Sequence, residues 1–115
     1  MSVIVNLALA TICFSGTCHK ALVGEDTPTG TFVLRHVATR QPGYGGDVLV
    51  FHETHRYAWA IHRVWLLDPA QHREQRIKSS NPSVRHITMG CINVTPKVYD
   101  ELISCCSAST LKVVK

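Results

Sequence analysis

A cysteine that directly follows a glycine is the feature of this sequence best suited to covalent chemistry. Cys91 lies between Gly90 and the apolar Ile92, so a backbone turn there can present a sulfur and nearby amide N–H groups to one point. That arrangement is typical of a thiol nucleophile with an oxyanion site. An unperturbed cysteine has a pKa of about 8.5 and is largely protonated at neutral pH, so such a nucleophile also needs a base or a cation nearby.

His62 is the preferred base among the seven histidines of the chain. It lies on a predicted strand, Tyr57–Trp65, where side chains alternate between two faces, and its neighbours on its own face are small. Space is therefore left beside it for a substrate or for Cys91, and proton transfer between the two side chains would give a thiolate and an imidazolium. The alternative is His86, five residues before Cys91, which a loop could bring to the sulfur.

These residues resemble the signature of the L,D-transpeptidase family (the YkuD-like catalytic domain), in which an upstream histidine is followed by a Ser/Thr-His-Gly-Cys-apolar-Asn motif. The matching positions are Thr88, Gly90, Cys91, Ile92 and Asn93. A second family marker, a Thr-Pro-Thr-Gly-Thr-Phe turn, is similar to residues 27–32. The two motifs occur in the family's order, and the resemblance extends over nearly the whole chain.

Three features depart from the family pattern and indicate a divergent member. Met89 occupies the position of the motif histidine, and Arg63 follows His62 where Gly or Ser is usual. The interval from His62 to Cys91 is also longer than usual.

The resemblance implies a cysteine-dependent peptidoglycan L,D-transpeptidase that acts on stem tetrapeptides. A thioester acyl-enzyme would form with loss of a terminal D-alanine, and an amine would resolve it, giving cross-linking or D-amino-acid exchange. Water in place of the amine would make the protein an L,D-carboxypeptidase that trims stem peptides, including as a secreted effector that targets the cell wall. A non-catalytic peptidoglycan-binding module is the alternative of another class, which the Met89 departure permits.

The turn around the sulfur supplies the expected oxyanion donors. These are the backbone N–H of Cys91 together with that of Gly90 or Met89. Thr88 and Asn93 are expected to shape the turn.

Three residues are candidates to bind substrate: Arg63, Arg85 and Tyr44. An arginine fork can hold a substrate carboxylate. Strand alternation, however, favours a surface position for Arg63 that points away from His62.

No metal and no organic cofactor is expected. The segment His52-Glu53-Thr54-His55 superficially resembles a zinc motif, but its histidines are three residues apart. The helical His-Glu-x-x-His motif needs four, and the segment is predicted as the end of a strand.

Length and composition predict a single folded domain, residues 1–115, which we expect to be a monomer. The apolar share is 45% and the charged share 17%, which excludes a disordered chain. The net charge of +4 is dispersed and favours an anionic polymer such as peptidoglycan. No basic helix or aromatic-basic motif indicates nucleic-acid binding, and no apolar run is long enough to span a membrane.

The apolar segment Val3–Phe14 lacks the basic start of a signal peptide and is interrupted by Asn6, so it is predicted as strand. The implied substrate places the protein in the periplasm or cell envelope, with the export route left open.

The other four cysteines are expected chiefly to be buried small side chains. Cys13 and Cys18 flank a predicted hairpin turn, so a cross-strand disulfide is the alternative for them in an oxidising compartment. Cys105 and Cys106 are adjacent, and no bridge between them is expected.

The elements predict a mostly β fold, the sandwich or barrel-like L,D-transpeptidase catalytic fold, with two short helices. The first helix should begin at Asp68-Pro69 and run to about Ile77, as one wall or lid of a cleft, and Thr95-Pro96 should begin the second. The glycine-rich loop 41–46 should border the cleft. The predicted strands are Val3–Leu9, Ala10–Phe14, Cys18–Val23, Thr31–Val37, Val48–His52, Tyr57–Trp65 and Leu111–Val114.

Overall fold

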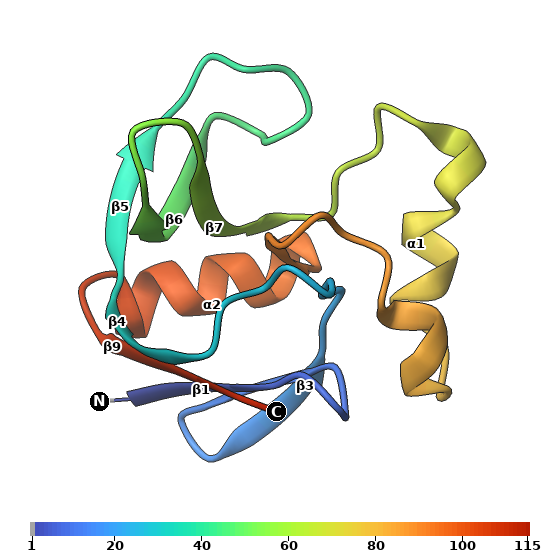
Figure 1. Ribbon diagram of the computed structural model, residues 1–115, viewed down its shortest axis with the longest axis horizontal. Coiled ribbons are helices and arrows are strands. Elements are labelled where there is room, and N and C mark those ends of the chain that lie inside the picture. Colours follow the sequence, from blue (N-terminus) through green and yellow to red (C-terminus); the bar gives the residue numbers. More distant parts are fainter. Residues whose placement is uncertain (1) are drawn as a thin grey trace.

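Two β-sheets and two short helices form the computed structural model, which describes residues 2–115 (Figure 1). The first sheet has the strand order β3-β2-β1-β9-β4 and the second the order β5-β6-β7-β8. The strands of the first sheet are β1 (Ser2–Asn6), β2 (Thr11–Phe14), β3 (Thr17–Lys20), β4 (Gly30–Val33) and β9 (Thr110–Val114). Those of the second are β5 (Arg35–Ala38), β6 (Asp47–Glu53), β7 (Ala58–Arg63) and β8 (Ile92–Val94). The mostly β fold class expected from the sequence is confirmed.

Helix α2 (Pro96–Cys106) connects the two sheets through one apolar core. It lies between them in the view of Figure 1. Its buried side chains include Tyr99 and Leu102, which join a cluster with Val5 of β1, Ile61 of β7 and Leu111 of β9. The predicted start of this helix is confirmed, because Thr95 caps it through its side chain, which accepts a hydrogen bond from the Val98 N–H.

The second sheet places the two motif segments side by side. Strands β7 and β8 pair in parallel, with His62 opposite Asn93. Parallel neighbours cannot be joined by a hairpin and need a long crossover. The crossover from β7 to β8 contains the 3₁₀ turns η1 (Pro69–Gln71) and η2 (Pro82–Arg85) and helix α1 (Arg73–Arg76), and it stands beside the sheets in Figure 1.

The first predicted helix is interrupted. Asp68 caps η1 by accepting a hydrogen bond from the Ala70 N–H, as the sequence indicates. His72 then takes a left-handed conformation, with φ 52°, so α1 starts only at Arg73. The left-handed residue separates η1 from α1, so the two do not form one continuous helix.

Two predicted strands also differ from the observed ones. The segment Thr31–Val37 divides at the buried Leu34 into β4 and β5, which belong to different sheets. The segment Cys18–Val23 ends as a regular strand at Lys20. After it, Leu22 and Val23 form isolated bridges with Asn93 and His86 instead of continuing a ladder.

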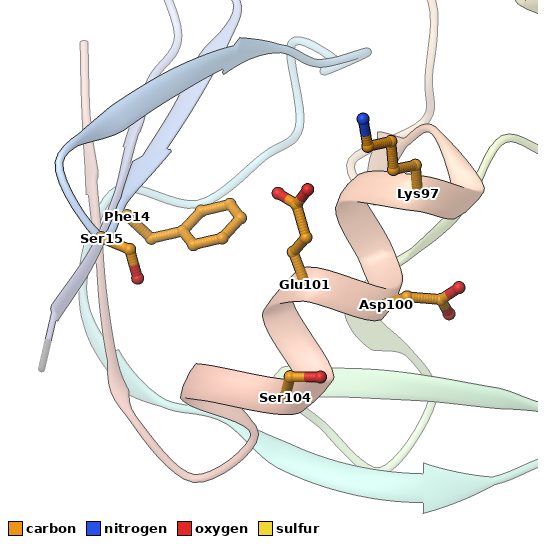
Figure 2. Close-up of a pocket in the computed structure, with 6 residues that line it drawn as sticks. All are labelled: Phe14, Ser15, Lys97, Asp100, Glu101 and Ser104. Carbon is orange, nitrogen blue, oxygen red and sulfur yellow. The ribbon is translucent and has the colours of Figure 1, made fainter.

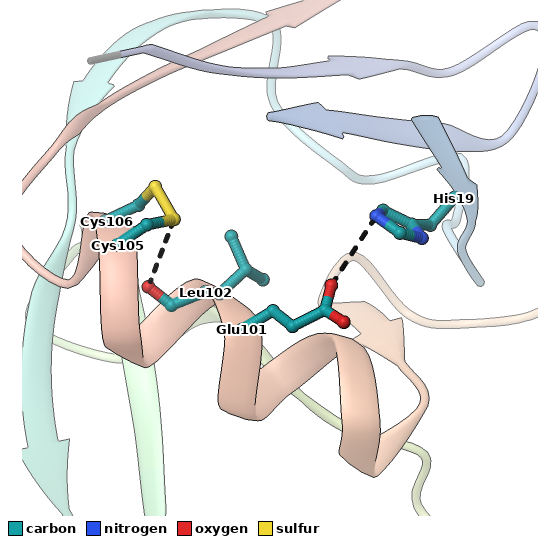
Figure 3. Close-up of a disulfide and its surroundings, with 5 residues drawn as sticks. All are labelled: His19, Glu101, Leu102, Cys105 and Cys106. Atoms are coloured by element: carbon teal, nitrogen blue, oxygen red, sulfur yellow. Dashed lines mark hydrogen bonds and ion pairs between the residues drawn. A yellow bond between two sulfur atoms is a disulfide. The ribbon is translucent and has the colours of Figure 1, made fainter. Parts of the chain in front are cut away.

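Four of the five cysteines form disulfides. Cys13 and Cys18 bridge β2 and β3, where they are paired in register. Cys105 and Cys106 bridge each other at the end of α2, where Figure 3 shows them near the Leu102 carbonyl. The expectation of unbridged, buried thiols at these positions is therefore wrong, for the adjacent pair as well. Cys91 is the free thiol among the five.

No helix within residues 2–115 has both the length and the apolar character needed to cross a membrane.

Arg85 fastens the crossover to the first sheet. Its side chain is 3% exposed. The guanidinium donates hydrogen bonds to the carbonyl oxygens of Leu9 (2.6 Å) and Ala10 (3.2 Å), in the turn after β1, and to that of Ser79. These contacts give Arg85 a structural role.

We expect Arg85→Met to destabilise the fold. The substitution keeps the apolar length of the side chain but leaves the carbonyl oxygens of Leu9 and Ser79 without a donor and that of Ala10 with the Ala21 N–H alone. We expect a loss of about 2–4 kcal/mol in the free energy of unfolding. Urea unfolding followed by circular dichroism measures it. Arg40→Met, at an exposed position, is the matched control and should leave the unfolding midpoint unchanged. Equal midpoints for the two variants would contradict the role of Arg85.

Candidate active site

A cleft of about 850 Å³ contains most of the residues singled out from the sequence. Its lining comes from the loop before β6, from β7 and its continuation, from the crossover, and from the segment before β8. Members of the lining are Asp26, Tyr44, Tyr57, Ala58, Trp59, His62, Trp65, Gln71, Arg73, Ile87, Thr88, Met89 and Cys91. The candidate nucleophile and the candidate base therefore face one space, with Tyr44, Thr88 and Met89 beside them.

The nucleophile turn requires glycine at position 90. Gly90 has φ +128°, a conformation that side chains rarely adopt. A Cβ there would also approach Nε1 of Trp59 to 2.6 Å and the carbonyl oxygen of Asp26 to 3.2 Å. The chain can thus pass close to β7, and the half-buried Cys91 follows directly before β8.

Two threonines hold this turn. Thr88 Oγ1 donates a hydrogen bond to the Cys91 carbonyl (2.6 Å) and accepts one from the Gly90 N–H (3.1 Å). Thr27 Oγ1, which is buried, donates to the Gly90 carbonyl (2.8 Å) and accepts from the Gly24 N–H (3.1 Å). The first residue of the Thr-Pro-Thr-Gly stretch is therefore bonded directly to the turn that carries the thiol.

These bonds limit which amides can bind an oxyanion. The Gly90 N–H is taken by Thr88 Oγ1, and the Thr88 N–H bonds the Val23 carbonyl at 3.0 Å. Within residues 2–115, the N–H groups of Met89 and Cys91 make no hydrogen bond. Of the expected donors, Gly90 is thus occupied, while Met89 and Cys91 remain.

His62 is held in one tautomer. Its Nδ1–H donates to the Arg63 carbonyl at 2.6 Å, which leaves Nε2 free of a proton in the neutral ring. Asn93 Nδ2 lies 3.4 Å from that Nε2. The Asn93 amide is itself oriented, because its Oδ1 accepts from the Trp65 N–H (3.2 Å) and from Arg73 Nη1 (3.0 Å). This nitrogen carries no proton, and in the structure its lone pair accepts the long hydrogen bond from the Asn93 N–H, so it takes up a proton only when that bond opens.

Burial determines the charge state of both groups. It lowers the pKa of His62 to about 4, and the nearby Arg73 charge lowers it too, against an opposing effect of the hydrogen bond to Arg63. Burial also raises the pKa of the Cys91 thiol, only partly offset by a hydrogen bond to the Ala60 backbone and by Arg73. The resting pair at neutral pH is consequently a neutral thiol and a neutral imidazole. The thiolate and imidazolium pair expected from the sequence is not the resting state.

Arg73 is the residue of the cleft that sequence reasoning missed. Its guanidinium lies 5.2 Å from the Trp65 ring centroid, and its Nε donates to Gln71 Oε1 at 2.7 Å. The crossover was expected to wall the cleft, and it does supply Gln71 and Arg73. The sequence shows several basic residues in the crossover, but it does not indicate that Arg73 reaches the cleft while Arg76 and Lys78 do not.

Tyr44 lies in the cleft, as predicted. Its ring meets the His62 ring edge-on, with 4.6 Å between centroids. Burial raises the pKa of its hydroxyl, and the proximity of Cys91 raises it further. The loop 41–46 therefore borders the nucleophile.

Arg63 and Arg85 lie outside the cleft lining. The Arg63 guanidinium donates to Asp47 Oδ1 (2.8 Å) and to the Tyr44 carbonyl (3.1 Å), and it lies 4.2 Å from the centroid of the Tyr99 ring. Like that of Arg85, it is engaged in holding the fold, so neither is placed to bind substrate. His86, the alternative base, bridges Val23 and also lies outside the lining.

A second hollow, of about 710 Å³, lies between the β2–β3 hairpin and α2 (Figure 2). It is lined by Phe14, Ser15, Lys97, Asp100, Glu101 and Ser104. Close by, His19 Nε2 lies 3.9 Å from Glu101 Oε2 (Figure 3). This lining includes no cysteine or histidine, so it does not offer the predicted chemistry. Within residues 2–115, no three His, Cys, Asp or Glu side chains are grouped so that they could hold a metal ion.

Solved structures of L,D-transpeptidases share this fold. L,D-transpeptidase 1 of Mycobacterium tuberculosis superposes with a TM-score of 0.58 at 15% identity, covering 99% of this chain and 58% of that one. The enzyme from Stackebrandtia nassauensis gives 0.60 at 13% identity, covering 99% and 55%, and that from Mycobacterium smegmatis gives 0.58 at 16%, covering 99% and 58%. No protein-family model and no curated protein matches the chain. The fold is thus that of L,D-transpeptidases, and the chain spans little more than half the length of these structures.

We expect Thr27→Val to loosen the nucleophile turn. The valine is nearly isosteric but leaves the Gly90 carbonyl and the Gly24 N–H without their partner, a loss of about 1–3 kcal/mol in the free energy of unfolding. Urea unfolding measures the loss. The rate at which iodoacetamide alkylates Cys91, the free thiol, reports the turn itself. Thr27→Ser keeps the hydroxyl and should behave as the original protein, so a serine variant as impaired as the valine variant would contradict the hydrogen-bonding role.

The alkylation of Cys91 should depend on pH as expected for a thiol whose pKa lies above its usual value. Because burial disfavours the thiolate, the rate with iodoacetamide should keep rising through pH 9 and show no plateau at neutral pH. Intact-protein mass spectrometry over pH 5–10 gives the profile. Cys91→Ser is the control and should gain no mass. A rate that is already constant between pH 6 and 8 would show a resting thiolate and contradict this assignment.

Proposed function

We propose that this chain is a cysteine-dependent peptidoglycan L,D-transpeptidase in which Cys91 is the nucleophile and His62 the base. One observation carries the proposal: a free thiol and an imidazole fixed with a proton-free nitrogen line the same cleft of an L,D-transpeptidase fold. The Thr27 and Thr88 bonds to the turn support it further. We take residues 1–115 as one catalytic domain.

In the proposed reaction, the long hydrogen bond from Asn93 Nδ2 to His62 Nε2 opens, and Nε2 accepts the thiol proton as the sulfur of Cys91 attacks the amide carbonyl of a stem peptide. Because both groups are neutral at rest, proton transfer accompanies attack instead of preceding it. The N–H groups of Cys91 and Met89 stabilise the oxyanion. Cleavage of the C–N bond releases D-alanine, which takes the proton from His62, and leaves a thioester on Cys91.

Deacylation repeats these roles with a second nucleophile. An amine attacks the thioester carbonyl, gives its proton to His62 and restores the thiol, which completes cross-linking or D-amino-acid exchange. If water enters instead, the product is a shortened stem and the activity is that of an L,D-carboxypeptidase. Either activity places the protein at the cell envelope, where its polymer is found.

A wall-binding module without catalysis is the second candidate. Met89 stands directly before Gly90, where the family motif has a histidine, and 88% of its surface is exposed. The missing histidine favours a module without catalysis. This candidate requires the same cleft to hold a stem peptide without acylation.

Incubation with purified muropeptides tests the proposal. We expect dimers or D-amino-acid-exchanged stems, resolved by liquid chromatography and mass spectrometry, and none with Cys91→Ala. His62→Gln should lower turnover by at least about 100-fold, since general-base catalysis contributes about 10²–10⁴-fold. Lys112→Gln, an exposed position on β9, should remain fully active.

The products decide among the candidates. Shortened stems alone indicate the carboxypeptidase. Absence of any product, together with retention of the protein on insoluble peptidoglycan and no carbapenem adduct on Cys91, indicates the binding module. Full turnover by Cys91→Ala with native circular dichroism would exclude this thiol as nucleophile.

A further inference from the structure

Arg73 places a cation in the cleft without an anionic partner. Its three contacts are the Gln71 amide oxygen, the Asn93 amide oxygen and the Trp65 ring, all of them neutral. Within residues 2–115, no carboxylate forms an ion pair with it. Asp68 acts on Arg73 only as a nearby charge, and its side chain caps Ala70.

The contacts hold the guanidinium in place without using up its donors. A guanidinium has five N–H groups, and the bonds to Gln71 and Asn93 use one each, which leaves three. The Trp65 ring supports one face of the planar group, an arrangement that favours a fixed fork over a mobile side chain. Because Asn93 also contacts the His62 ring, the fork is fixed relative to the base.

The charge lies within electrostatic reach of the reacting groups. Arg73 lines the same cleft as Cys91, and its charge partly offsets the rise that burial causes in the pKa values of the Cys91 thiol and the Tyr44 hydroxyl. The resting thiol is nevertheless neutral, so Cys91 does not neutralise the guanidinium. Asp26, the carboxylate of the lining, is exposed and forms no ion pair with Arg73.

We propose that Arg73 recognises a carboxylate of the peptide substrate close to the carbonyl that Cys91 attacks. A fixed, half-buried fork with free N–H groups and no internal counter-ion matches a carboxylate in both charge and shape. The identity of this carboxylate rests on the proposed transpeptidase function. In that reaction it is the C-terminal carboxylate of the residue that leaves the stem peptide. Arg73 would then select peptides that end at that residue.

Alkylation of Cys91 by two small reagents tests the anion site without requiring turnover. Iodoacetate carries a carboxylate one carbon from its reacting centre, and iodoacetamide is its neutral counterpart. The ratio of the two rates cancels any change in thiol pKa or exposure. We expect Arg73→Gln to lower the iodoacetate to iodoacetamide ratio roughly fivefold at about 0.05 M salt, the size of effect typical of a partly screened charge pair.

Two further variants complete the comparison. Arg73→Lys keeps the charge but not the fork and should retain part of the preference. Lys112→Gln makes the same change in net charge at an exposed position of the other sheet and should leave the ratio unchanged. A ratio equal in the original protein and in Arg73→Gln would overturn the anion site, and so would an equal fall in Lys112→Gln.

The second arm compares two tetrapeptide stems, one with a free C-terminal carboxylate and one with a C-terminal amide. The original protein should prefer the acid in kcat/KM roughly tenfold or more, as expected of a charge-assisted bidentate contact, and Arg73→Gln should lose the preference. If neither stem is turned over, the transpeptidase function fails while an altered alkylation ratio still supports the anion site. If the acid and the amide are turned over equally, selection of the C-terminus by Arg73 is excluded.

Discussion

The side chain of Asn93 connects the parts of the candidate site. It is fully buried, and its Oδ1 accepts hydrogen bonds from the Trp65 backbone and from the Arg73 guanidinium, so its Nδ2 is left toward His62. Its backbone N–H and carbonyl both bond Leu22, each at 2.9 Å. An unsatisfied buried amide would cost roughly 1–3 kcal/mol, so strand β8, the crossover and the base are each constrained by this residue. The parallel register of β7 and β8 sets Asn93 opposite His62 and thereby makes these bonds geometrically feasible.

A second network holds the other side of the base. The Arg63 carbonyl accepts the His62 Nδ1–H, and the Arg63 side chain is fixed by Asp47, which also bonds His36 Nε2 at 2.6 Å and the Tyr99 hydroxyl at 3.1 Å. These bonds help to keep the pKa of Asp47 below its ordinary value in spite of burial. The departure at position 63 from the small residue usual in the family therefore has a structural consequence. A long cationic side chain ties the strand of the base to the loop of Tyr44 and to helix α2.

The sequence predicts well those features that depend on local geometry. Thr95-Pro96 starts a helix because the cap and the proline act within one turn, and the mostly β fold follows from short β-branched segments between turn residues. Features that depend on residues distant in the sequence cannot be predicted from local patterns. Leu34 divides a continuous β pattern because β4 and β5 pair with different strands, β9 and β6. Arg85 was predicted to bind substrate, because its hydrogen bonds to the distant carbonyls of Leu9 and Ala10 cannot be read from the sequence.

The same limit explains what was found and missed at the site. Cys91, His62 and Tyr44 share the cleft because the motif residues occupy β7, β8 and the loop beside them. Arg73 depends on the left-handed His72, which ends η1 and begins α1 in a new direction. A left-handed backbone is uncommon for residues other than glycine, so a histidine at position 72 does not predict it.

The long interval between His62 and Cys91 accounts for the positive charge within the cleft. Parallel neighbouring strands require a crossover connection, and here the crossover also contributes residues to the cleft. It stands beside the sheets (Figure 1), is fastened by Arg85 to the turn after β1, and carries Gln71 and Arg73 into the cleft wall. Burial keeps both the thiol and the imidazole neutral, and Arg73 adds a positive charge to the same cleft. On the proposal that Arg73 recognises a carboxylate, a substrate that supplies a negative charge is stabilised by Arg73 and a neutral one is not. On the same proposal, the interval between His62 and Cys91 encodes the preference of this chain for a charged substrate.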